Sequence, residues 1–255
     1  MEKIGERLVW NYLPFTDIQI PGGGVNILTI FNTLVVMAIL WTLMWLALRS
    51  PGRIPGRGQI LLEAFVAAFD DLVSSSLAFP ERSANRKFLP LIASLFMFLC
   101  LANFMGFIPE LLGTAIFEEP TGDINCTLAL GFMAITIATV CGVKSKGARG
   151  FFGELLGPMW NEEGATGMAL VMGKASALFF FPLNVIGEMA KVVSISFRLF
   201  GNIIGGSIII VVVSTLVFNT FIPIGLDLFF VFFVGTVQAF VFTMLTLTYI
   251  SVAIK

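Results

Sequence analysis

The chain has 255 residues, of which 57% are hydrophobic and only 12% are charged, and its formal net charge is −1. This composition lies outside the range of soluble domains and predicts an integral membrane protein. The 15 basic residues are spread over small loop groups, so no basic face is available for a nucleic acid. The chain has no histidine and no CxxC pair, so we expect no metal, haem or iron–sulfur site and no cofactor.

Three apolar segments, at 25–48, 88–110 and 124–143, follow a polar tail at 1–24 that we expect to be external. Each is close to the roughly 20 residues that cross a hydrocarbon core of about 30 Å, which predicts three spanning helices. Between the first two, residues 58–79 have the pattern of an amphipathic helix. The pattern leaves open whether this helix lies on the membrane surface or packs against another subunit. Its apolar side contains Leu61, Phe65, Ala68, Phe69 and Leu72.

The last part of the chain predicts two further elements, at about 165–218 and 227–254, with a turn around 219–225. A helix from 174 to 218 would extend roughly 68 Å at 1.5 Å per residue, which is too long for an upright crossing. The first element is therefore either broken or strongly tilted. We expect an all-α membrane protein in which residues 25–255 form a single membrane domain with about five membrane-embedded helices. The last two should form a long tilted hairpin.

Basic residues predict the orientation of these segments. They flank the loop after the first span and open the loop after the third, whereas the loop at 113–123 has none. By the positive-inside rule, we expect the N-terminus outside and the C-terminus in the cytoplasm.

A polar stripe runs along the first arm of the predicted hairpin at intervals of three and four residues. Arg198 lies in this stripe with apolar residues before and after it, although a charge at the middle of a bilayer costs roughly 3 kcal/mol. Because arginine keeps its proton at any accessible pH, we expect Arg198 to act as a fixed positive charge. The stripe consists of Asn184, Glu188, Lys191, Ser194, Arg198, Asn202 and Gly205.

Other polar residues of the hairpin have less specific patterns. Glu188 and Lys191 stand three apart, and this spacing favours a structural ion pair and a functional role equally. In the second arm, the mid-span amide of Gln238 suits an interhelical partner for Arg198. Asp227 stands at the predicted start of the second arm and is expected to be an interfacial N-cap.

The hairpin carries two motifs, Arg-Leu-Phe-Gly-Asn at 198–202 and Gln-Ala-Phe-Val-Phe-Thr-Met-Leu-Thr-Leu-Thr-Tyr at 238–249. Together they resemble the a subunit of bacterial F-type ATP synthases. The resemblance extends over roughly residues 25 to 252. It implies an ion-translocating subunit of the bacterial inner membrane, with no catalytic site in this chain. The implied partners are the ring of c subunits, subunit b of the peripheral stalk and membrane lipid.

The resemblance also implies a mechanism. Protons or sodium ions reach a carboxylate on the c-ring through one aqueous half-channel and leave it through another. Arg198 is implied to separate the half-channels, while Asn202 and Gln238 hold the arginine and line the ion path. The coupling ion stays open, because selectivity should reside largely in the ring.

Three positions depart from the family pattern, one of which is Val192 in place of the proline that commonly follows the lysine. The other two lack a titratable group. Ser207 stands nine residues after the arginine and Val231 seven residues before the glutamine, where many members carry an acidic residue or a histidine. The ion inlet must then use other groups. The candidates for the half-channels are Ser207, Asp227, Asp123, Glu110, Glu188, Lys191 and Asn184.

The main alternative is a secondary transporter with a broken helix and a substrate-binding arginine, because such proteins use half-helix ends and buried charges. Repeated halves are not evident in the sequence, which weighs against it. A quinone or haem anchor is a third interpretation, and the absence of histidine weighs against that one.

Overall fold

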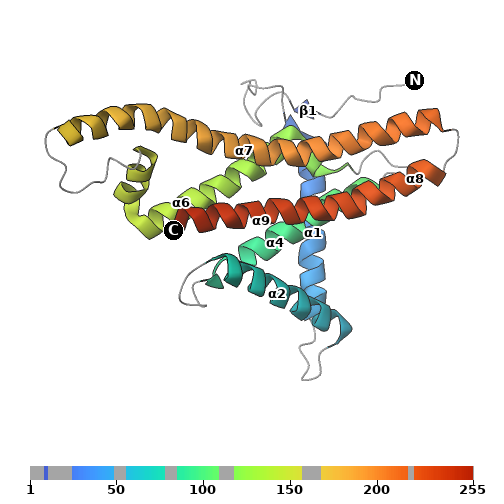
Figure 1. The fold of residues 1–255 in the computed structure, drawn as a ribbon. Helices are drawn as coiled ribbons and strands as arrows, with labels where there is room; N and C mark the ends of the chain where they lie inside the picture. The colour runs from blue at the N-terminus through green and yellow to red at the C-terminus, as the bar shows by residue number, and fades with distance from the viewer. Residues whose placement is uncertain are drawn as a thin grey trace.

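The computed structural model describes residues 9–10, 25–48, 56–77, 85–108, 118–156, 168–217 and 221–254. Within these ranges the chain is helical apart from a minimal antiparallel pairing of two-residue strands. This confirms the expected all-α membrane protein. In chain order (Figure 1) the elements are β1 (Val9–Trp10), β2 (Val25–Asn26), α1 (Ile27–Leu48), α2 (Arg57–Ser76), α4 (Leu89–Phe104), the 3-10 helices η1 (Met105–Phe107) and η2 (Pro120–Gly122), α6 (Ile124–Leu156), α7 (Met168–Leu216), α8 (Phe221–Leu228), the π-helical η4 (Phe229–Val234) and α9 (Gly235–Ile254).

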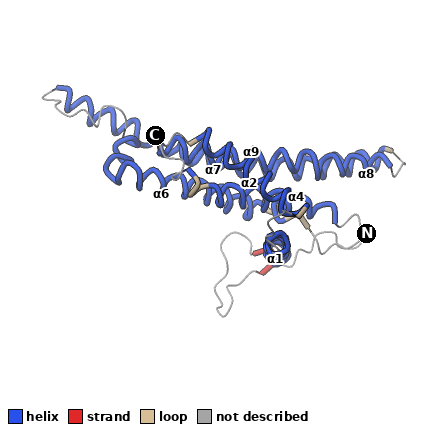
Figure 2. Tube along the Cα trace, turned by 90° about the horizontal axis from the view of Figure 1, so that it is seen from below, coloured by secondary structure: helices blue, strands red, loops and turns tan. Residues whose placement is uncertain are grey.

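Five helical segments among the described residues are long and apolar enough to cross a membrane. The hairpin of α7 with α8, η4 and α9 runs across Figure 1, and α1 stands across it. Figure 2 shows α1 end-on while the hairpin extends across the view. An upright α1 therefore gives the hairpin a strong tilt. The five segments are Ile27–Leu46, Leu89–Phe107, Ile124–Gly153, Leu178–Leu216 and Ile222–Ile254.

The first arm of the hairpin, α7, is one continuous helix of 49 residues. At 1.5 Å per residue it extends roughly 74 Å. It continues through Pro182, although proline lacks the N–H of a backbone hydrogen bond. Of the two sequence-based alternatives, a broken helix and a tilted one, the structure has the unbroken helix.

The second arm begins earlier than predicted. α8 starts at Phe221 and continues through η4 into α9, so Asp227 lies inside the helix and is only 6% exposed. The predicted interfacial N-cap is therefore wrong. Pro223 and Gly225 made this stretch resemble a turn. However, Pro223 falls in the first turn of the helix, where its missing N–H needs no partner.

The third spanning helix, α6, ends at Leu156 rather than at the predicted residue 143. It bends at Gly147, whose φ of 76° lies in the left-handed region that glycine adopts without steric cost. The basic residues Lys144, Lys146 and Arg149, expected in a loop, lie on the helix around this bend.

The predicted amphipathic helix is α2, and it packs into the chain's own core. Phe69, Val73 and Leu77 are buried in a cluster with residues of α4, α6 and α9. The predicted apolar side was only partly right, because Leu61 is 73% exposed. One face of α2, with Phe69 and Val73, is thus buried within the chain. The face that carries Leu61 is exposed.

A second core cluster sets the rotation of α7. Ile195 and Leu199 are buried against α4, α6 and α9, in contact with residues such as Leu99 and Phe242. Arg198 consequently lies on the side of α7 that faces away from the rest of the chain.

Candidate functional site

A hydrogen bond joins the two arms of the hairpin near their centres. The Nδ2 of Asn202 donates to the Oε1 of Gln238 over 2.6 Å. Gln238 is 4% exposed and lies at the middle of the span Ile222–Ile254. The sequence predicted Gln238 as a partner for Arg198. Its oxygen instead accepts from Asn202, one helical turn further along α7.

Arg198 lies near the middle of the span Leu178–Leu216 and is exposed. No hydrogen bond or ion pair joins it to another residue of the described ranges. The arginine is therefore presented on the surface of the chain and is not buried inside it. A charge at this depth needs water or a carboxylate from outside the chain, because lipid cannot solvate it.

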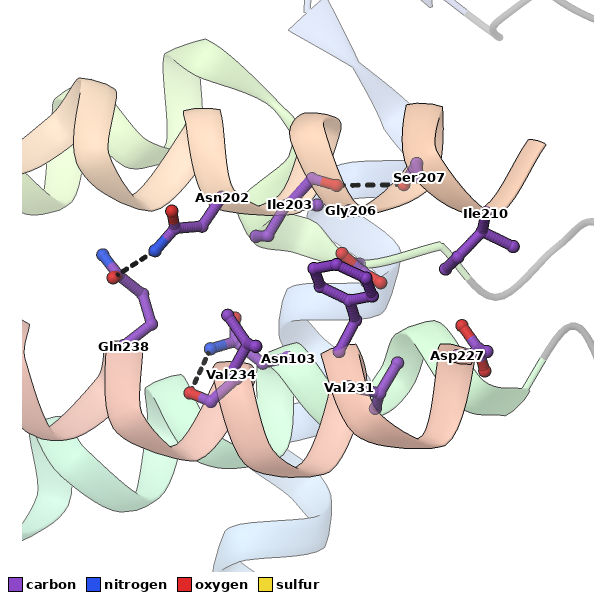
Figure 3. Close-up of a pocket in the computed structure, with 13 residues that line it drawn as sticks. Asn103, Asn202, Ile203, Gly206, Ser207, Ile210, Asp227, Val231, Val234 and Gln238 are labelled. Carbon is purple, nitrogen blue, oxygen red and sulfur yellow. Dashed lines mark hydrogen bonds between the residues drawn. The ribbon is translucent and has the colours of Figure 1, made fainter. Parts of the chain in front are cut away.

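A small polar cavity lies between the hairpin arms, next to the Asn202–Gln238 bond (Figure 3). We call it the narrow cavity. It offers about 40 Å³ to the centres of water molecules, enough for roughly three waters. Its polar lining residues are Asn103, Glu119, Asn202, Ser207, Asp227 and Gln238.

The two positions that lack the family's titratable groups both lie on this cavity. Ser207 and Val231 belong to its lining, and neither side chain titrates near neutral pH. The hydroxyl of Ser207 donates to the carbonyl of Ile203 in its own helix. The predicted candidates Asn202, Ser207, Asp227 and Gln238 are thus brought together, although Ser207 is engaged with its own backbone.

Asn103 of α4 ties the wall of the narrow cavity together. Its Nδ2 donates to the carbonyl of Gly235 over 2.9 Å, and its Oδ1 accepts from the hydroxyl of Thr121 over 2.8 Å. Asn103 is 3% exposed and Thr121 is fully buried. A Cβ at position 235 would lie 3.1 Å from the Cβ of Asn103, so glycine there permits the close approach of α4 and α9.

Glu119 reaches the same cavity from the segment before η2. Its carboxylate occupies the space beside Gly106, where a Cβ would overlap it. Burial, helped by repulsion from Asp227 and Glu118, raises the pKa of Glu119 to about 7. A carboxyl group with such a pKa can both bind and release a proton near neutral pH.

A larger space adjoins the narrow cavity and shares Glu119, Ile203 and Ser207 with it. We call it the wide hollow. It offers about 530 Å³ to the centres of water molecules. Its lining carries two further carboxylates, Glu118 and Asp123. Glu119 and Ser207 therefore stand where the two spaces meet.

Asp123, a predicted half-channel residue, has a clear structural role in the wide hollow. Its Oδ1 accepts from the backbone N–H of Asn125 over 2.9 Å, as an N-cap of α6 does. Its Oδ2 accepts from the hydroxyl of Thr29 on α1 over 3.0 Å. The carboxylate thereby holds the start of α6 against α1.

The remaining candidates of the stripe lie on the other side of Arg198. Lys191 pairs with Glu188, which confirms the pairing that their spacing allowed, and its ammonium also lies 5.7 Å from the ring centroid of Tyr249. Asn184 donates to the carbonyl of Leu155 at the end of α6 over 2.9 Å. None of these three residues lines the narrow cavity or the wide hollow.

Two residues of the narrow cavity, Glu119 and Asn103, were not among the candidates predicted from the sequence. Glu110 lies outside the described residues. Glu119 was missed because nothing in its neighbourhood in the sequence relates it to the hairpin. The signal that was available is a pair of carboxylates in a loop without basic residues. Asn103 stands in an apolar segment, where a buried amide already indicates an interhelical partner.

Comparison with known proteins identifies the family. Residues 29–251 match the family model described as ATP synthase A chain. The chain is 34% identical to ATP synthase subunit a of Moorella thermoacetica over 223 residues, which cover 88% of each chain. It is 31% identical to ATP synthase subunit a of Aliarcobacter butzleri, with 93% of each chain covered. The chain therefore belongs to the ATP synthase subunit a family, whose members are ion-translocating membrane subunits of the complex.

Proposed function

We propose that this chain is the stator subunit that passes ions to and from the carboxylates of a c-ring through two aqueous half-channels, with Arg198 as the separator. One observation carries the proposal. The narrow cavity, with room for a few waters, extends to the Asn202–Gln238 bond, one helical turn from an arginine that faces outward at mid-span. A polar path inside the chain thus leads towards a fixed positive charge on its surface.

The surroundings of Arg198 support a ring as the partner. The same open side of α7 exposes large apolar residues, among them Phe197, Ile209 and Leu216. An apolar surface interrupted by one cation suits an apolar helical partner that carries one carboxylate. Facing that carboxylate, the guanidinium would favour its charged form and promote release of the ion, while its own charge blocks a direct leak.

The two half-channels would lie on opposite sides of Arg198. The wide hollow and the narrow cavity, with Asp227, Ser207 and Glu119, would form the external one. The polar residues Asn184, Glu188 and Lys191 would line the cytoplasmic one. This assignment follows the orientation that the basic residues predict, with the N-terminus outside and the C-terminus in the cytoplasm. Subunit b of the peripheral stalk and lipid would cover other outer faces.

The unbroken course of α7 weighs against the transporter alternative, which needs a broken helix at the binding site. The membrane potential sets the energy scale of the favoured function: at about 100 mV each charge that crosses delivers roughly 2.3 kcal/mol. A subunit with two water-filled paths must therefore prevent their direct connection.

The experiment is Arg198→Ala in the assembled synthase, reconstituted into liposomes. Ion-driven ATP synthesis should be lost, and the membranes should become passively permeable to the coupling ion. Arg149→Ala is the matched control, because Arg149 is exposed on α6 and lines neither cavity. Normal coupled synthesis by the Arg198→Ala synthase would refute the proposed function.

A further inference from the structure

Many family members carry titratable groups at the positions of Ser207 and Val231, and the narrow cavity lacks them. It contains two other carboxyl groups. Glu119 and Asp227 both line it. We propose that Glu119 and Asp227 form a two-carboxyl proton relay from the wide hollow to the Asn202–Gln238 bond, replacing the groups missing at Ser207 and Val231. The inference rests on the function proposed above and makes the proton its coupling ion.

The position of Glu119 is the first argument. It lines both the wide hollow and the narrow cavity, so its carboxyl group is within reach of water in either space. The Glu119 side chain can lie here only because residue 106 is a glycine, since a Cβ at that position would overlap its carboxylate. Glu119 is thereby held in the wall that the two spaces share.

The position of Asp227 is the second argument. It lies one helical turn before Val231 on the same arm of the hairpin, and Figure 3 shows both side chains on the cavity side of that arm. With 6% exposure, Asp227 is withdrawn from bulk water. A carboxyl group at this point can exchange protons with the cavity water that extends to Gln238.

The charge balance is the third argument, and it favours protons over metal cations. Asp123 and Glu118 face the wide hollow, Glu119 and Asp227 face the narrow cavity, and no lysine or arginine of the described residues lines either space. Asp227 is buried and Glu119 is half-buried, so two ionised carboxylates this close would repel each other. Binding one proton relieves the repulsion, and the raised pKa of Glu119, about 7, agrees with this.

The relay step conserves protons and charge. A hydronium ion in the wide hollow transfers its proton to the Glu119 carboxylate. Glu119 passes a proton to the Asp227 carboxylate, directly or through cavity water, and becomes a carboxylate again. Asp227 then releases its proton to the water beside Gln238, which delivers it to the ring carboxylate. Each passage returns both side chains to their starting state.

The test is proton transport by the assembled synthase in liposomes, measured as ATP-driven pumping and as synthesis over a series of pH values. Glu119→Gln and Asp227→Asn should each reduce transport about tenfold or more, the scale of a lost acid–base group. Glu63→Gln is the matched control: its carboxylate lies on the exposed face of α2 and accepts only from Gln59 among the described residues. Adding Ser207→Glu to Glu119→Gln should restore part of the transport.

Three outcomes separate the ideas. If Arg198→Ala uncouples the synthase while Glu119→Gln and Asp227→Asn both transport like the wild type, the relay is wrong and the proposed function stands. If Arg198→Ala stays coupled, the proposed function itself fails. If transport by the wild type requires sodium ions at constant pH, the relay is again refuted.

A measurement on the wild-type synthase tests the relay even if the variants do not assemble. Carbodiimides react with protonated carboxyl groups, so mass spectrometry of the labelled wild-type synthase reports the protonation of Glu119. Labelling at Glu119 should fall as the pH rises through about 7. Equal labelling of Glu119 from about pH 5 to about pH 9 would contradict the relay.

Discussion

Asn202 binds Gln238 across the hairpin, so the amide expected to hold Arg198 instead holds the residue one turn beyond it. The arginine makes no hydrogen bond to a described residue, and the Asn202–Gln238 pair forms part of the wall of the narrow cavity. Within the motif at 198–202, Asn202 therefore joins the two arms of the hairpin, while Arg198 faces outward.

We expect Gln238→Leu to weaken both the hairpin and ion transport. The change leaves the Nδ2 of Asn202 without its acceptor and should cost about 1–3 kcal/mol of unfolding free energy. The measurement is thermal unfolding of the purified chain in detergent, together with ATP synthesis by the assembled complex. Thr248→Val is the control, because Thr248 is exposed on the same helix and donates to the carbonyl of Met244 in that helix. Equal stability of the two variants would mean that the Asn202–Gln238 bond contributes nothing to the fold.

Asn103→Leu should destabilise the chain more than any exposed polar change. It removes the donor to Gly235 and the acceptor of Thr121, two buried groups at the wall of the narrow cavity. A loss of about 2–4 kcal/mol follows if each unsatisfied group costs between one and two. Ser94→Ala is a suitable control, because Ser94 is exposed and donates to its own helix. A midpoint of thermal unfolding equal to that of the control would rule out this network as a structural element.

Gly131→Ala should loosen the crossing of α6 and α7. A Cβ at position 131 would overlap the Oγ of Ser196 and lie 3.2 Å from the carbonyl of Val192, so the helices must separate, at about 1–3 kcal/mol. Gly187→Ala, on α7 with open space around it, should be neutral or stabilising by up to about 1 kcal/mol. Unfolding in detergent distinguishes the two, and similar effects of both would show that the crossing tolerates a side chain.

The spans and their central residues could be predicted from the sequence, because hydropathy and the spacing of polar residues are local properties. Arg198 and the Glu188–Lys191 pair follow from this spacing. Asp227 was misplaced because Pro223 and Gly225 resemble a turn, whereas proline is also tolerated in a first helical turn. Glu119 could not be placed at all. Its contact with the hairpin depends on how the segment before α6 folds back over α4, which no local pattern encodes.

Glu119 should also make stability depend on pH. Its pKa rises from 4.5 to about 7 on folding, so between these values the folded chain binds more protons than the unfolded chain. Stability should therefore fall as the pH rises from about 4.5 to about 7, by no more than roughly 3 kcal/mol. Thermal unfolding of Glu119→Gln over this range should show a flatter profile. A variant profile as steep as that of the wild type would assign the dependence to other groups.

The separation of two half-channels by Arg198 is tested most directly by passive proton conductance of liposomes that contain the synthase without nucleotide. Arg198→Ala should raise the conductance well above that of the wild type, and adding Glu119→Gln should lower it again, because the leak must pass through the narrow cavity. An Arg198→Ala synthase as proton-tight as the wild type would contradict the account.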